Sequence, residues 1–141
     1  MNILNNQKKV RFALRPFEEF FEKAMLQLKL KPDSAAIAFV TDAEIARLNG
    51  IYRKQNKPTD VLSFPAQATK GVRKSRFLGD IAIAPAVARR YAQKNGRTLQ
   101  NEICILILHG ILHLLGYDHE VDQGQMDRVE LKLRRKLGLG L

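Results

Sequence analysis

The hydrophobic and polar positions of this chain repeat with two periods, which predicts a mixture of helices and strands. Apolar residues at i, i+3 and i+4 spacing predict helices over about 16–28, 42–52, 85–95, 98–115 and 121–137. Short runs rich in β-branched and aromatic residues predict strands over 35–40, 61–64 and 77–84. Because helices and strands do not alternate strictly, the order favours an α+β fold over a doubly wound sheet.

Residues that start and stop helices support these boundaries. Pro16 suits the first turn of a helix, Thr98 can cap the helix that follows it, and Gly96 can end the one before. The segment 98–115 is apolar nearly all round, so we expect it to be the buried central helix. The segment 66–76 is polar and basic without a period, which predicts an exposed loop.

Composition and charge narrow the class of protein. With 141 residues, of which 45% are hydrophobic, we expect one domain over 1–141 with one core. The longest apolar run, 103–108, is too short to span a membrane, and the first residues lack the apolar segment of a signal peptide. The lone Cys104 lies in that run, so we expect a buried thiol and a location in the reducing cytoplasm.

The formal net charge of +10 indicates a polyanionic partner. Phosphate contacts supply most of the non-specific affinity of proteins for nucleic acids, so nucleic acid is the partner that this charge favours. The alternative is a surface that is basic and merely well solvated.

All three histidines of the chain, His109, His113 and His119, lie within eleven residues. The first two are four residues apart and therefore share one face of a helix. Gly116 can end that helix in a left-handed conformation, which would let His119 turn back toward the other two. Three converging neutral imidazoles predict a metal site with room for water, although histidines bonded to backbone in a core are the alternative.

The spacing H-x-x-x-H-x-x-G-x-x-H is that of the metzincin metalloproteases, which predicts a zincin-like metal helix. Those proteases carry a glutamate, their general base, directly after the first histidine, where this chain has Gly110. The difference argues against peptide hydrolysis but not against a metal. Asp118 could orient a ligand imidazole or be a turn residue, and Tyr117 fits a core or turn position better than a catalytic one.

Three segments together resemble the YbeY family of bacterial endoribonucleases. They are LNGIYR at 48–53 with PTDVLSFP at 58–65, LGDI at 78–81, and the histidine motif at 109–119. An N-terminal strand and helix match only in outline. The pattern and the resemblance lead us to expect a mixed sheet of about four strands packed with about five helices.

The resemblance implies a single-strand-specific, metal-dependent endoribonuclease that matures the 3′ end of the small-subunit ribosomal RNA and acts in ribosome quality control. It implies one zinc ion on His109, His113 and His119, with Arg53 as the functionally important arginine. Ribosomal particles and ribosome-associated proteins would be the partners. Imidazoles also suit other divalent transition metals.

The residue chemistry agrees with this role for Arg53. A guanidinium is always charged and can contact a phosphate through two hydrogen bonds, so Arg53 is expected to hold a phosphate near the scissile bond. We therefore expect catalysis to depend on Arg53 and His109, with either a metal-activated water or a ribose 2′-hydroxyl as the nucleophile. The bases of 70–76 would hold RNA outside the site, whereas Ser63 and Asp80 could border it.

Two other functions remain open. A metalloprotease-like hydrolase fits the histidine spacing, but Gly110 and the positive charge oppose it. A non-enzymatic ribosome-assembly factor with a structural metal would need a fourth protein ligand, for which the sequence offers no obvious candidate other than Asp118 or Glu120.

Overall fold

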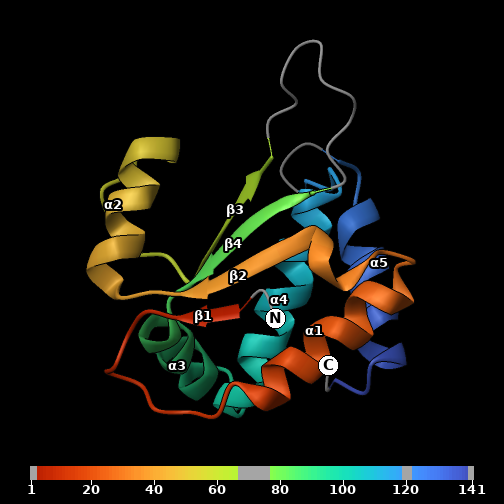
Figure 1. The fold of residues 1–141 in the computed structure, drawn as a ribbon, viewed down its shortest axis with the longest axis horizontal. Helices are drawn as coiled ribbons and strands as arrows, with labels where there is room; N and C mark the ends of the chain where they lie inside the picture. The colour runs from red at the N-terminus through yellow and green to blue at the C-terminus, as the bar shows by residue number, and fades with distance from the viewer. Residues whose placement is uncertain (1–2, 67–76, 119–121, 140–141) are drawn as a thin grey trace.

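The computed structural model describes residues 3–66, 77–118 and 122–139. The helices are α1 (Arg15–Gln27), α2 (Asp42–Arg53), α3 (Pro85–Lys94), α4 (Leu99–Leu114) and α5 (Gln125–Lys136), with a 3₁₀ turn, η1, at Pro32–Ser34. The strands are β1 (Ile3–Asn5), β2 (Ala35–Phe39), β3 (Val61–Pro65) and β4 (Gly79–Ile83). This is the expected α+β fold (Figure 1). The zincin-like character and the single domain over 1–141 stay predictions.

The four strands form one mixed sheet in the order β1-β2-β4-β3. β1, β2 and β4 run parallel, and β3 pairs antiparallel with β4 at the edge. Both faces of the sheet are used, because alternate residues of β2 and β4 point to opposite sides. Ile37 and Ile81 join the main core with α1, α4 and α5, whereas Ala82 packs with Ile45 of α2 on the other face.

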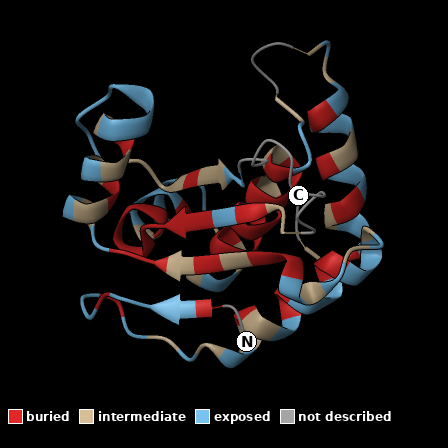
Figure 2. Ribbon diagram, turned by 45° about the horizontal axis from the view of Figure 1, so that its top comes forward, coloured by how far each residue is buried: buried red, intermediate tan, exposed pale blue. Residues whose placement is uncertain are grey.

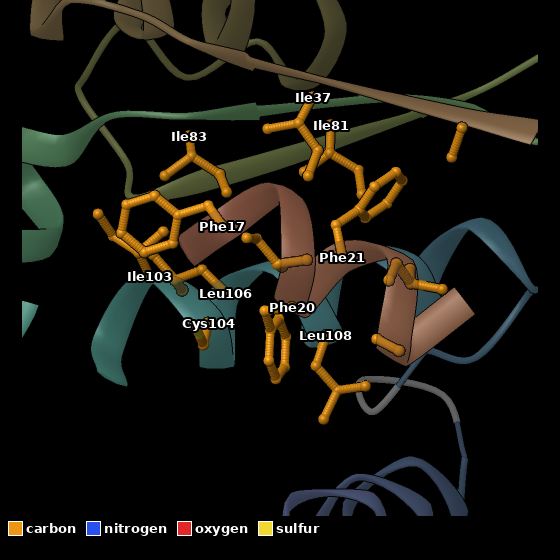
Figure 3. Packing of buried hydrophobic residues seen from close by; sticks show 14 of the residues in the cluster. Phe17, Phe20, Phe21, Ile37, Ile81, Ile83, Ile103, Cys104, Leu106 and Leu108 are labelled. Atoms are coloured by element: carbon orange, nitrogen blue, oxygen red, sulfur yellow. The ribbon is translucent and has the colours of Figure 1, made fainter. Parts of the chain in front are cut away.

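α4 is the buried central helix that the sequence predicts. It packs against α1, α3, α5 and the strands β3 and β4. Its apolar side chains meet the phenylalanines of α1 and the isoleucines of β2 and β4, as Figure 3 shows. Figure 2 shows that burial concentrates on this helix and the inner strands, while α2 and the end of β1 are largely exposed. The position of α4 is therefore fixed by the core.

Most predicted boundaries are confirmed by their caps. The Thr98 hydroxyl accepts from the backbone N–H of Asn101 at 3.1 Å at the start of α4. One prediction is wrong: α5 begins at Gln125, not near position 121. Gly124 has a φ of +90°, which cannot continue a right-handed helix, and the Asp122 carboxylate accepts from the N–H groups of Gly124 and Met126.

No helix in the described part of the chain is both long and apolar enough to cross a membrane. The predicted loop at 66–76 falls almost wholly outside the described residues.

Candidate functional site

Two of the three predicted metal ligands meet on one face of α4. His109 and His113 are one helical turn apart, and their Nε2 atoms lie 3.0 Å from each other. This separation matches the spacing argument, which placed both imidazoles on the same side of the helix. His119, the third predicted ligand, lies outside the described residues.

A carboxylate from another helix fixes the first of these imidazoles. Nδ1 of His109 lies 2.9 Å from Oε1 of Glu130 on α5. An ionised carboxylate can only accept, so Nδ1 carries the proton in this contact, and in the neutral imidazole the lone pair then lies on Nε2. Arg134, one turn further along α5, donates to the other oxygen of Glu130 at 2.6 Å. The lone pair of His109 is therefore aimed at His113 by a chain of two hydrogen bonds.

The electrostatics of Glu130 support this arrangement. Burial is the largest single influence and raises the pKa of Glu130, but the hydrogen bond from His109 and the charge of Arg134 together outweigh it and hold the pKa below its ordinary value. Glu130 therefore stays ionised and available as an acceptor near neutral pH.

A neighbouring side of α4 approaches the sheet closely at Gly110. A Cβ at this position would lie 2.8 Å from Cγ2 of Ile81 on β4, which is closer than real Cβ contacts come. The Ser63 hydroxyl on β3 donates to the Gly110 carbonyl at 3.2 Å and ties the helix to the edge strand. A glutamate after the first histidine would thus meet the sheet, which gives a physical reason for its absence.

The histidines open into a cleft of about 670 Å³. Its wall is formed by β3, by the end of α2 and by the segment between them. The lining residues are Tyr52, Arg53, Thr59, Asp60, Val61, Leu62, Ser63, Phe64, Pro65, His109, His113 and Asp118. The structure thus brings Arg53 into one cavity with His109 and His113, although Arg53 is far from both histidines in the sequence.

Asp60 and Asp118 line the cleft, whereas Asp80 does not. Burial raises the pKa of Asp60, while hydrogen bonds to backbone N–H groups and the nearby His109 oppose the increase. Asp118 shares the cavity with the histidines, which is compatible with either of its proposed roles. Asp80 is exposed on β4, opposite Phe64, and is not among the lining residues.

The end of α4 turns as Gly116 predicts. Gly116 has a φ of +98°, its N–H donates to the His113 carbonyl at 3.0 Å, and the Tyr117 N–H donates to the Leu112 carbonyl at 3.1 Å. These two bonds form a Schellman motif, which ends the helix and redirects the chain. Tyr117 packs against the core, so its predicted structural role is confirmed.

Sequence reasoning missed three residues of this site. Glu130 had a signal, because it is a charged residue on the apolar side of α5, between Met126 and Leu133. Tyr52 and Asp60 lie in the segments 48–53 and 58–65 that carry the family resemblance, but no local pattern shows that their side chains line the cleft, which depends on the packing of α2 and β3.

The donor set fits a divalent transition metal. Two imidazole nitrogens on one tetrahedral zinc ion are separated by roughly 3.3 Å, given Zn–N bonds of about 2.0–2.1 Å, and the two Nε2 atoms here are 3.0 Å apart. A carboxylate behind a ligand histidine is also the usual support of such a site. Within the described ranges no group of three or more metal-ligating side chains occurs, so the three-histidine site stays a prediction.

Fold and cleft together define a small α+β protein with paired histidines and an arginine around one cavity, a constellation typical of metal-dependent hydrolases. The family model described as endoribonuclease YbeY matches residues 2–138. The chain therefore belongs to the YbeY family.

Individual relatives agree. An endoribonuclease YbeY of Solibacter usitatus is 51% identical over 98 residues, which cover 70% of this chain and 62% of that protein. Those of Myxococcus xanthus and Aquifex aeolicus are each 42% identical over 118 residues, covering 82% and 84% of this chain and 40% and 77% of the relatives. The matched part of this chain thus spans less than two thirds of the Solibacter and Myxococcus proteins.

A solved structure has the same fold. The solution structure of a Thermotoga maritima protein superposes with a TM-score of 0.63 at 28% identity, covering 96% of this chain and 88% of the other.

Proposed function

We propose that this protein is a metal-dependent endoribonuclease that cleaves single-stranded ribosomal RNA near the 3′ end of the small-subunit RNA and acts in ribosome quality control. The observation that carries the proposal is the convergence of His109, His113 and Arg53 on one cleft of a protein of the YbeY family. The relatives named above are described as endoribonucleases. Ribosomal particles, with their associated proteins, are the partners proposed, which puts the activity in the cytoplasm.

The proposed metal is one zinc ion, held by His109, His113 and His119. When bound, such an ion supplies Lewis acidity toward phosphoryl oxygens and makes coordinated water more acidic. Side chains of the protein itself orient the ligand histidine and bind the substrate in this proposal. Glu130 keeps Nδ1 of His109 protonated, so that its Nε2 can donate a lone pair to the ion.

Arg53 holds the substrate in this proposal. It is the last residue of α2 and lines the same cleft as the histidines. Two parallel N–H groups can hold a phosphate of the RNA in a fixed orientation and offset the charge that gathers on its oxygens during cleavage. The bases of 70–76 are proposed to extend this contact along the RNA, which neutralising them would show as a shallower dependence of binding on salt.

Metal analysis combined with RNA cleavage tests the function. The native chain should carry about one metal per molecule and cut a single-stranded ribosomal RNA fragment, whereas His113→Ala should lose both. Arg53→Ala should keep the metal and cut poorly, because its role is to hold phosphate. A metal-loaded native protein that cuts neither free nor ribosomal RNA would support the assembly-factor alternative instead.

A further inference from the structure

An exposed aromatic ring stands in the cleft next to Arg53. Tyr52 is 64% exposed, although it is a large residue in the last turn of α2 and lines the same cavity as the histidines. One side of its ring rests against Phe64 of β3, with the ring centroids 4.6 Å apart and the planes inclined by 54°. The proposed nuclease mechanism gives this ring no task.

The backbone that carries Tyr52 is held firmly. The Asn49 side chain is buried in α2 and donates from Nδ2 to the carbonyl of Lys57 at 3.0 Å, which ties the helix to the segment that follows it. Gly50 packs so closely on Asn56 that a Cβ there would collide with its side chain. A ring on such a support needs little reordering to receive a ligand.

The segment that carries this ring is positively charged, although Asp60 and Asp118 also line the cleft. The stretch from position 51 to 58, IYRKQNKP, contains three bases and no acid. Arg53, Lys54 and Lys57 are all exposed. Proteins bind single-stranded nucleic acid by combining a basic groove along the backbone with aromatic rings on which bases stack.

We propose that Tyr52, supported by Phe64, is a stacking platform for one unpaired base of an RNA strand that crosses the histidine cleft. The inference rests on the proposed function and deepens it, because it supplies a reason for single-strand selectivity. A base in a duplex is already stacked on both sides and paired, so it can reach the ring only after it is unstacked. An unpaired base can stack without that cost, while Arg53 contacts a phosphate of the same strand.

Binding of a single-stranded oligoribonucleotide to the full chain in the presence of a chelator tests the platform without cleavage. Base–aromatic stacking energies predict that Tyr52→Ala binds between about 5-fold and about 150-fold more weakly. Tyr52→Phe, which restores the ring without the hydroxyl, should recover the affinity. The matched control is Tyr91→Ala, because Tyr91 is also an exposed tyrosine, at 46%, but lies on α3 away from the lining of the cleft.

An abasic scan identifies the stacked base. The native protein should lose affinity when one particular nucleotide of the oligonucleotide is made abasic, and Tyr52→Ala should be indifferent to that same change. The slope of affinity against salt should be unchanged in Tyr52→Ala but shallower in Arg53→Ala, since only the arginine displaces a counterion. A Tyr52→Ala variant that binds like the native protein, or that remains sensitive to the abasic position, overturns the platform.

Cleavage of the same RNA with metal present separates this inference from the proposed function. If the native protein cuts RNA but Tyr52→Ala binds and cuts equally well, the nuclease stands and the platform is overturned. If base-dependent binding through Tyr52 is found without any cleavage, the platform stands and the nuclease fails. A native protein that binds no single-stranded RNA overturns both.

Discussion

Replacing Glu130 tests how the structure orients the first histidine of the site. Glu130 accepts two hydrogen bonds, from Nδ1 of His109 at 2.9 Å and from Arg134 at 2.6 Å. Its side chain is 11% exposed and that of Arg134 is 14% exposed, so solvent screens the pair little. Glu130→Ala removes both bonds and leaves the guanidinium buried without its carboxylate.

The size of the effect follows from these contacts. Removing one partner of a buried ion pair costs about 3–5 kcal/mol. Because neighbouring side chains can relax into the space left by Glu130, we expect the lower end of this range, a loss of about 3 kcal/mol in the free energy of unfolding. Loss of the support behind a ligand histidine lowers metal affinity by about 10-fold to 100-fold. Glu130→Gln keeps an acceptor for His109 and should fall between the native protein and the alanine variant in both measurements.

Zinc affinity, measured by competition with a chelator, and urea unfolding check these values. Asp127→Asn is the matched control, because Asp127 is an exposed acid on the same helix that makes no contact with the histidines in the described structure. A folded Glu130→Ala variant with native zinc affinity would refute the reasoning, since His109 would then be oriented without the carboxylate.

The pH dependence of this variant has a defined sign. The pKa of Glu130 lies below its ordinary value of 4.5 in the folded protein. Between the folded and unfolded pKa values the unfolded chain binds more protons, so the contribution of Glu130 to stability is present above pH 4.5 and is lost as the pH falls further. The difference in unfolding free energy between the metal-free native protein and Glu130→Ala should therefore narrow in acid.

Three further predictions concern buried groups near the site. Gly110→Ala should lower the free energy of unfolding by on the order of 1 kcal/mol, because crowding against Ile81 outweighs the gain in helix propensity; a stabilised variant would contradict the close approach. Cys104 should not react with a disulfide reagent at pH 8 until urea unfolds the chain, since burial raises the pKa of its thiol to about 12; rapid native labelling would contradict this. Burial also raises the pKa of Asp60 above 3.8, so its ionisation lowers the free energy of unfolding. In urea unfolding of the metal-free proteins, Asp60→Asn should therefore become more stable relative to the native protein as the pH rises from 3 to 7. A difference in unfolding free energy that does not change with pH would exclude this effect.

The local parts of the fold could be predicted because their causes are local. Thr98 caps α4 with its own hydroxyl, and Gly116 ends that helix because its left-handed backbone is inexpensive for glycine. The start of α5 was placed wrongly because the apolar period continues across Gly124, and periodicity does not show the left-handed turn at that glycine. The pairing of the strands and the position of Tyr52 depend on contacts between distant segments, which no local pattern records.

In the candidate site, too, local sequence predicts some features, while others depend on packing between distant segments. The spacing of His109 and His113 on one helix is enough to predict that their imidazoles meet, whereas Glu130 reaches His109 only because α5 packs beside α4. A charged residue on the apolar side of α5 does indicate that its carboxylate has a buried partner. It does not say which partner, and only the packing of the two helices identifies the imidazole.

The rotation of α4 explains why the histidine motif of this chain differs from that of the proteases. The helix is held in its core by contacts on nearly all sides, with Gly110 against Ile81 and the Gly110 carbonyl bonded to Ser63. With this rotation His109 faces the cleft while the next position faces the sheet. A glutamate there would either collide with β4 or require the whole helix to turn and the histidines to leave the cleft. Peptide hydrolysis by the protease mechanism is therefore opposed by the packing of the core as well as by the missing residue. Arg53, at the C-terminal end of α2, is the cleft residue that we propose contacts the RNA.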